Sequence, residues 1–242
     1  MKQLTDYIIS SHDRSEGREP IEWANFWYSE TNSTPPRPRI LLIGDSTARM
    51  VRSTFERVAR RPVDMIGTSC GLNDVLFGKQ MEAFFASEQF CYDCIFVQVG
   101  HHSIKNVHGE EYSEDDFRQF RKDYLGLLDF LQQYSNNIVL LTNFLNVSSL
   151  PKWASCKLKS LPILIYRKIV GEKIDWLWSA TVQRKNEIIL EIAKSKGYKF
   201  CDIDSLMRKD CQGCFPKYIH VDHIHYEPRA KVPIVLEYMK YI

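Results

Sequence analysis

Short apolar runs alternate with segments of helical periodicity from Arg39 onward, and this alternation restricts the fold more than any other feature. Strands are expected at the five apolar runs, 40–43, 63–66, 94–99, 138–141 and 198–203. Strands that alternate with helices form βαβ units, whose right-handed crossovers place helices on both faces of a parallel sheet. The pattern therefore predicts an α/β fold, a three-layer α/β/α sandwich around a five-stranded parallel sheet of the flavodoxin-like kind.

The expected helices have recognisable ends. Ser113 to Asp116 resembles a capping box with Asp in place of the usual Glu, and it predicts the start of the helix that follows. Ser179 is expected to cap another helix, which Gly197 closes. Apolar residues also recur at helical spacing after the first strand, and further helices are expected at 73–87 and 230–241.

The 242 residues are expected to form one domain with two additions. Residues 1–38 end in a proline-rich stretch and are predicted to be an N-terminal arm that packs on the main body. Residues 39–242 are predicted to be the main domain, with a basic and aromatic insert at about 146–178 that contains Trp153. Three interpretations of the insert stay open: a solvated helical excursion, a surface for an anionic glycan, and peripheral attachment to an anionic membrane.

The charge balance and the cysteine count exclude some classes of protein. Lys and Arg number 32 and Asp and Glu 30, so the formal net charge of +2 gives no whole-chain attraction for nucleic acid. Seven cysteines are an odd number and argue against a secreted disulfide framework. The first residues lack the pattern of a signal peptide, and no apolar run is long enough to predict a transmembrane helix. We expect the protein to be cytoplasmic.

Glycine and polar residues follow the first three predicted strands, at the edge where the carboxyl ends of parallel strands meet. After the first strand comes Gly44-Asp45-Ser46, where Ser46 is placed as a nucleophile or as a plain helix N-cap. Gly71 follows the second strand and either brings a backbone N–H to an oxyanion or forms a simple tight turn. After the third strand, Gly100-His101-His102 indicates either a site or a surface loop.

A further acid–histidine pair lies near the end of the chain. A turn can bring the carboxylate of Asp222 to the imidazole of His225, whose other ring nitrogen then faces a nucleophile. A metal site is the competing interpretation, because three histidines and Asp222 lie within residues 220–225.

Two Cys-x-x-Cys pairs raise a second metal hypothesis. A Cys₄ zinc site would join Cys91, Cys94, Cys211 and Cys214. The 116 residues that separate the two pairs are far more than a zinc ribbon has. We therefore expect no metal.

Together and in this order, these residues resemble the SGNH subgroup of the GDSL hydrolase family. Gly44-Asp45-Ser46 matches the first block of that family, and Gly71 matches the glycine of its second block. Asp222 and His225 match its last block, Asp-x-x-His. The resemblance covers about 39–242, and it implies the same three-layer α/β/α sandwich.

The third block departs from the family. Gly100-His101-His102-Ser103 stands where Gly-x-Asn-Asp is usual, so His102 replaces an oxyanion-donating Asn. An imidazole N–H can also donate. A looser similarity connects this block to carbohydrate O-acetyltransferases that have related Gly-Asp-Ser and Asp-x-x-His motifs.

The resemblance also implies roles for the site residues. Ser46 would be the nucleophile, His225 the base, and Asp222 the group that orients His225. The oxyanion hole would consist of the N–H groups of Ser46 and Gly71 and the side chain of His102.

The expected activity is that of a serine esterase that removes O-acyl groups, chiefly acetyl, from a carbohydrate or polysaccharide. The alternative is an O-acetyltransferase that moves acetyl from acetyl-CoA to a saccharide hydroxyl; a catalytically inactive binding module is a third hypothesis. The esterase needs no cofactor, whereas acetyl-CoA would be the donor of the transferase. Asp45, Asn73, His101 and Trp153 are expected to contact the substrate.

Overall fold

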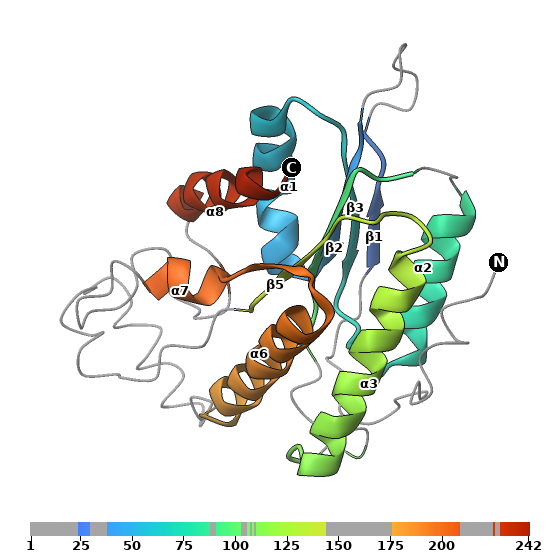
Figure 1. Cartoon of the computed structure of the whole chain (residues 1–242), viewed down its shortest axis with the longest axis vertical. Coiled ribbons are helices and arrows are strands. Elements are labelled where there is room, and N and C mark those ends of the chain that lie inside the picture. Colours follow the sequence, from blue (N-terminus) through green and yellow to red (C-terminus); the bar gives the residue numbers. More distant parts are fainter. Residues whose placement is uncertain are drawn as a thin grey trace, which may run out of the picture.

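A six-stranded, mostly parallel sheet forms the centre of the protein. The computed structural model describes residues 24–29, 38–87, 91–102, 106, 108, 110–143, 176–208, 225 and 228–242. The strand order is β1-β3-β2-β4-β5-β6 (Figure 1). The five parallel strands confirm the predicted runs; they are β2 (Ile40–Gly44), β3 (Val63–Thr68), β4 (Cys94–Gln98), β5 (Ile138–Leu141) and β6 (Lys199–Cys201).

Helices cover both faces of the sheet, as the alternating pattern predicted. On one face lie α2 (Val75–Ser87), α3 (Glu114–Leu131) and α6 (Trp176–Lys196). On the other lie α1 (Ser46–Ala59), α7 (Ile203–Arg208) and α8 (Lys231–Tyr238), the last flanked by the 3₁₀ turns η3 (Pro228–Ala230) and η4 (Met239–Tyr241). The result is the three-layer α/β/α sandwich (Figure 1).

Each face of the sheet has its own hydrophobic core. Successive strand residues point to opposite faces, so Leu41 and Ile43 pack under α2, α3 and α6 while Ile40 and Leu42 pack under α1 and α8. Strands that are covered on both faces are buried along their whole length, and β2 to β5 are buried at every residue. No helix in the described part of the chain is long and apolar enough to cross a membrane.

The predicted helix ends are partly correct. The capping box before α3 is confirmed, because the Ser113 hydroxyl accepts from the Asp116 N–H while the Asp116 carboxylate accepts from the Ser113 N–H. Gly197 ends α6 with a φ of 75°, a conformation that glycine adopts without strain. The prediction that Ser179 caps this helix is wrong, because α6 begins three residues earlier, at Trp176.

Two elements differ from the sequence prediction. The fifth strand was expected to extend to residue 203, but β6 ends at Cys201 because the Asp202 carboxylate accepts from the Ser205 N–H at 2.9 Å and starts α7. The sheet also has a sixth strand, β1 (Ala24–Trp27), which pairs antiparallel with β3. All four residues of β1 are exposed. A strand without a buried face needs no alternation of apolar and polar residues, so the sequence pattern did not predict β1.

A buried polar network fixes β1 to the amino ends of β2 and β3. Asp64, which has no exposed surface, forms an ion pair with Arg39 and accepts from the Ser29 N–H at 2.9 Å and the Tyr92 hydroxyl at 3.1 Å. Arg52 of α1 donates to the Ser29 hydroxyl at 2.8 Å. Burial, together with the charge of Asp64, raises the pKa of Tyr92 far above its usual range, so its hydroxyl stays a donor. The network therefore joins five segments of the chain: those that hold Ser29, Arg39, Arg52, Asp64 and Tyr92.

Replacement of Asp64 by Asn should therefore destabilise the fold. The substitution leaves the buried Arg39 guanidinium without its counter-charge, and loss of one partner of a buried pair lowers the free energy of unfolding by about 3–5 kcal/mol. Asp93 pairs with Arg61 on the surface at 3.8 Å, so Asp93→Asn is the matched control and should change the free energy by less than about 1 kcal/mol. Urea denaturation measures both values, and equal effects of the two variants would contradict the assigned role of the network.

Candidate active site

The site lies at the carboxyl ends of β2, β3 and β4. The register pairs Gly44 with Gly67 of β3 and with Gln98 of β4, so the three strands end side by side. Gly44 is the point of closest approach: a Cβ at this position would lie 2.6 Å from the Cβ of Ala48 and 3.0 Å from the Gln98 carbonyl oxygen. Only glycine lets α1 begin directly after β2, and this tight turn presents the next residues at the sheet edge.

Ser46 is the first residue of α1, but it is not the residue that caps the helix. Asp45 is the N-cap, and its Oδ1 accepts from the Thr47 N–H at 2.8 Å and from the Thr47 hydroxyl at 2.6 Å. The half-buried Ser46 hydroxyl thus has no capping role and sits at the positive end of the helix dipole. The capping alternative for Ser46 is therefore wrong.

His225 meets this serine from a distant part of the chain. Its Nε2 lies 2.9 Å from the Ser46 Oγ, a hydrogen-bond distance between residues 179 positions apart in sequence. A neutral imidazole with this nitrogen as acceptor can take the hydroxyl proton. Asp222 lies outside the described residues, so its contact with His225 stays a prediction.

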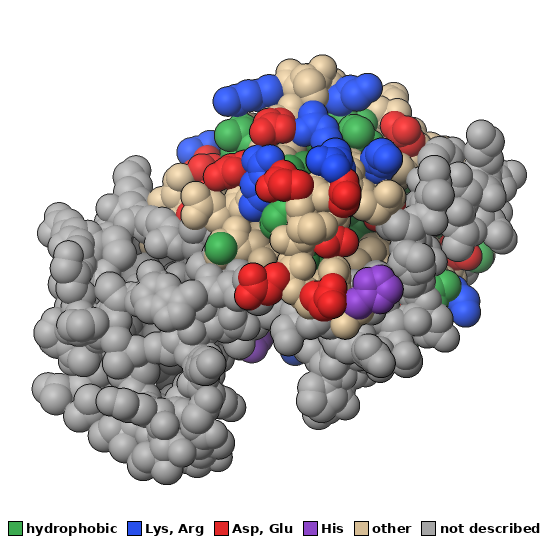
Figure 2. All heavy atoms as spheres, turned by 90° about the horizontal axis from the view of Figure 1, so that it is seen from below, with side chains coloured by type: hydrophobic (Ala, Val, Ile, Leu, Met, Phe, Trp, Pro, Cys, Tyr) green, Lys and Arg blue, Asp and Glu red, His purple; other side chains and the backbone are tan. Residues whose placement is uncertain are grey.

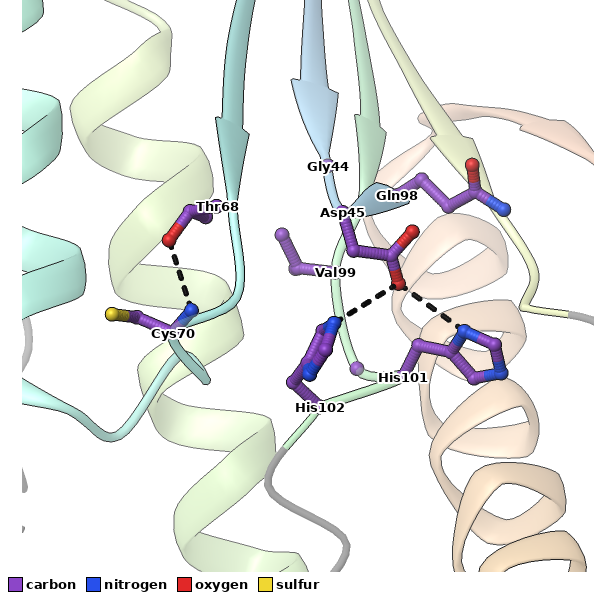
Figure 3. A pocket seen from close by; sticks show the side chains of 9 residues that line it. Gly44, Asp45, Thr68, Cys70, Gln98, Val99, His101 and His102 are labelled. Atoms are coloured by element: carbon purple, nitrogen blue, oxygen red, sulfur yellow. Dashed lines mark hydrogen bonds and ion pairs between the residues drawn. The ribbon is translucent and has the colours of Figure 1, made fainter. Parts of the chain in front are cut away.

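The two adjacent histidines surround the carboxylate of Asp45 (Figure 3). His101 Nδ1 lies 3.2 Å from Asp45 Oδ2, and both side chains are about 5% exposed or less. His102 Nε2 lies 4.0 Å from the same oxygen and is more accessible. Asp45 and His101, two of the expected substrate contacts, thus contact each other, and their contact with a substrate stays a prediction.

The pKa of Asp45 reflects this environment. Burial by itself raises the pKa of the carboxyl. The hydrogen bond with His101, the charges of His101 and His102 and the hydrogen bond with Thr47 outweigh burial and hold the pKa well below its usual range. Asp45 is therefore a permanent carboxylate one residue before Ser46.

The turn after β3 completes this side of the site. The Cys70 N–H donates to the Thr68 hydroxyl at 2.9 Å, and the Gly71 carbonyl accepts from the Asp74 N–H at 2.9 Å, just before α2 begins. Gly71 is buried, and Asn73 is half-buried in the same turn. Trp153, another expected substrate contact, lies outside the described residues.

A small pocket opens between these turns. Figure 3 shows Thr68 and Cys70 on one side of it and Asp45 with the two histidines on the other. Its lining in the described part of the chain comprises Gly44, Asp45, Thr68, Cys70, Gln98, Val99, Gly100, His101 and His102. Polar groups from the ends of β2, β3 and β4 thus line one pocket, and one of them, Asp45, is the residue before Ser46.

Most residues of the two metal hypotheses lie outside the described residues, among them His220, Asp222 and His223 of the histidine cluster. The described residues include no group of three or more His, Cys, Asp and Glu side chains that could hold a metal ion. Cys94 lies in the core beneath α1 and α8, where burial raises the pKa of its thiol to about 12, so it is a poor source of thiolate for zinc. Cys211 and Cys214 lie outside the described residues.

Two residues that were not predicted as site residues, Lys185 and Asn143, contact the backbone of the histidine turn. Lys185 of α6 is buried, and its Nζ donates to the His102 carbonyl oxygen at 3.4 Å. Asn143, at the end of β5, donates to the Val99 carbonyl oxygen at 3.2 Å. A signal for Lys185 exists in the sequence, because it interrupts the apolar stripe formed by Val182, Ile189 and Ile192.

Comparisons with known proteins bear on the fold. No protein-family model and no curated protein matches the sequence. Among solved structures, Axe2, an acetylxylan esterase from Geobacillus stearothermophilus, aligns with 85% of this chain and 94% of its own at a TM-score of 0.55 and 11% identity.

Two further structures are similar over the same extent. LAE5, an alpha/beta hydrolase enzyme from the metagenome of Lake Arreo, aligns with 85% of this chain and 95% of its own at a TM-score of 0.55 and 13% identity. A protein from Streptococcus pneumonia that is described as a platelet activating factor aligns with 86% of this chain and 85% of its own at a TM-score of 0.58 and 15% identity. The chain therefore has the fold of the SGNH hydrolases, as the order of its motifs suggested.

Proposed function

We propose that the protein is a serine-dependent acyl-ester enzyme in which Ser46 is the nucleophile and His225 the general base. The contact of 2.9 Å between His225 Nε2 and Ser46 Oγ is the observation that carries the proposal. A hydroxyl is a weak nucleophile until a base removes its proton, and a histidine within hydrogen-bond distance is the usual activator. Asp222 would fix the tautomer of His225, as the Asp-x-x-His resemblance implies.

The reaction would proceed in two steps through an acyl-enzyme. Ser46 Oγ attacks the ester carbonyl carbon while His225 Nε2 takes the hydroxyl proton. The tetrahedral intermediate collapses, the bond to the leaving alcohol breaks, and His225 returns the proton to that alcohol. Water, or another hydroxyl, then attacks the acyl-enzyme with His225 again as the base, and Ser46 is restored.

The negative charge on the carbonyl oxygen needs donors in both steps. The Ser46 N–H stands at the free N-terminus of α1, where the helix dipole favours an anion. Gly71 would supply a second N–H from the turn after β3. The His102 imidazole, whose Nε2 lies 4.0 Å from the Asp45 carboxylate, would supply a third donor.

The substrate proposed is an acetylated carbohydrate. The likeness to Axe2, an acetylxylan esterase, supports it, and two of the matched Axe2 structures are catalytic mutants in which a serine and an aspartate are each replaced by alanine. Figure 2, which looks at the molecule from the lower side of Figure 1, shows acidic and basic side chains interspersed on the described surface. Such a mixed surface suits a neutral sugar ester better than a strongly charged ligand.

A second candidate is transfer of acetyl from acetyl-CoA to a saccharide hydroxyl. His102, in place of the family's Asn, is the observation that favours it, because related O-acetyltransferases also have His after the third-block glycine. In this reaction the thioester of acetyl-CoA would acylate Ser46, and a sugar hydroxyl would replace water as the acceptor. The same Ser46–His225 pair would serve both reactions.

Ser46→Ala should abolish turnover of p-nitrophenyl acetate and leave the fold intact. Without the hydroxyl no acyl-enzyme forms, and kcat should fall by about 10³-fold or more. Ser53, exposed on the same helix, is the matched control, and Ser53→Ala should keep wild-type kcat. Hydrolysis and thermal unfolding are measured side by side, and wild-type turnover by Ser46→Ala would exclude the assigned nucleophile.

Ser46 and His225 should behave as one unit. Because each residue needs the other, the double variant Ser46→Ala/His225→Ala should lose no more kcat than either single variant. His108→Ala is the matched control, since this histidine is exposed, whereas His225 contacts Ser46. Additive losses of kcat in the double variant would show that the two residues act independently.

A partition experiment separates the esterase from the transferase. Purified protein is incubated with an acetylated xylo-oligosaccharide, and separately with acetyl-CoA and the deacetylated oligosaccharide. Release of acetate in the first mixture, abolished by Ser46→Ala, is expected for the esterase. Release of CoA in the second mixture that requires the oligosaccharide would favour the transferase instead.

A further inference from the structure

Lys185 is a charged residue in an apolar layer. It lies on the side of α6 that faces the sheet and is 1% exposed, between the buried Val182 and Ile189. Lysine is among the residues least often fully buried, because removal of an ammonium group from water is unfavourable. A buried cation at such a position indicates a role that a leucine could not fill.

We infer that Lys185 is a positioning residue for the His101–His102 turn, and through it for the oxyanion hole. The inference rests on the proposed function. The Lys185 Nζ donates to the His102 carbonyl oxygen at 3.4 Å, which fixes the peptide that follows the candidate oxyanion donor. The ammonium also lies 4.4 Å from the ring centre of Tyr112 and 5.1 Å from that of Phe120, so aromatic faces hold it in place.

The same turn is held at its other end. The Asn143 side chain donates to the Val99 carbonyl oxygen at 3.2 Å, so the carbonyls on both sides of Gly100 and His101 are bound. Asn186, the neighbour of Lys185 on α6, brackets Asn143: its Oδ1 accepts from the Asn143 N–H at 2.9 Å and its Nδ2 donates to the Asn143 carbonyl. One helix and one strand end thus support the whole turn.

The absence of a side chain at Gly100 lets the backbone of the turn lie close to Asn143 and Lys185. The φ of Gly100, 124°, lies in the region that side-chain-bearing residues rarely adopt. A Cβ at Gly100 would lie 3.1 Å from the Asn143 Nδ2 and 3.7 Å from the Lys185 Cδ. The backbone of the turn therefore rests directly on these two side chains, and their position determines where His101 meets Asp45 and where His102 points.

The consequence concerns rate more than binding. The His102 donor matters when negative charge develops on the substrate carbonyl, so displacement of the turn weakens the transition state more than the ground state. Loss of Lys185 should thus lower kcat and leave KM nearly unchanged.

Lys185→Met is the test, because methionine keeps a long side chain against Tyr112 and Phe120 but has neither charge nor donor. We expect kcat for p-nitrophenyl acetate to fall about 10–100-fold, with KM within about twofold of the wild type. The thermal midpoint is measured beside kcat, so that a loss of rate at the site is distinguished from a loss of stability. Lys185→Gln keeps an N–H donor and should recover part of the lost kcat.

Lys199→Met is the matched control. The exposed Lys199 also donates to a backbone carbonyl, that of Tyr241 at 3.1 Å, but at β6, and its variant should keep wild-type kcat. Wild-type kcat in Lys185→Met, or equal losses in Lys185→Met and Lys185→Gln that follow a lowered thermal midpoint, would overturn the inference.

A fluorophosphonate probe, which reacts with an activated serine, distinguishes failure of the Lys185 inference from failure of the proposed function. Labelling of the wild type that is absent in Ser46→Ala supports Ser46 as the nucleophile, and the labelling rate of Lys185→Met should fall with its kcat. If the wild type shows neither Ser46-dependent labelling nor Ser46-dependent turnover, the proposed function is overturned together with the inference. If it shows both while Lys185→Met labels at the wild-type rate, only the inference fails.

Discussion

The close contact at Gly44 is the constraint on which the site depends. β2 lies in the middle of the sheet, and its last residue leaves no room for a side chain between Ala48 of α1 and the backbone of β4. Because α1 begins without a connecting loop, the residue after the N-cap stands at the sheet edge with its N–H at the helix N-terminus. The parallel register then brings the turns after β3 and β4 to the same edge.

Asp45 connects this turn to the next strand end. One carboxylate oxygen caps α1 through Thr47, and the other faces His101 and His102 at the end of β4. A single buried charge therefore sets both the start of the helix that carries Ser46 and the location of the histidine turn.

The sequence patterns predict the central sheet well because four of its five parallel strands, β2 to β5, are buried at every residue and appear as apolar runs. They do not predict β1, whose four exposed residues have no periodicity and whose place depends on pairing with β3. They predict α6 but not its start, since Ser179 is a plausible cap by residue type although the helix extends past it. α7 begins with a carboxylate cap from Asp202, which appears in the sequence as an ordinary residue at the end of a strand.

In the candidate site, too, some features could be predicted from the sequence and others could not. The order of glycines, serine and histidines at strand ends suggests the meeting of Ser46 with the turns after β3 and β4, because parallel strands share one edge. The ion pair of Asp45 with His101 could not be predicted, since it depends on side-chain directions in two turns that are 56 residues apart. Lys185 was visible as a charge within an apolar stripe, but its partner, a backbone carbonyl on another segment, was not.

Buried charges lie at both ends of the sheet. Those at the amino ends stabilise the fold, and those at the carboxyl ends position the turns of the site. At the amino ends, Asp64 is enclosed by Arg39, Ser29 and Tyr92, and these contacts fix β1. At the carboxyl ends, Asp45 and Lys185 bind the turns that surround Ser46 instead of closing on each other. A buried charge that binds a backbone turn at a strand end stabilises the fold less than an apolar side chain would. It does fix the position of polar groups to a fraction of an ångström. The parallel sheet permits this arrangement, because one end can carry the stabilising pairs while the other keeps its charges for the geometry of the site.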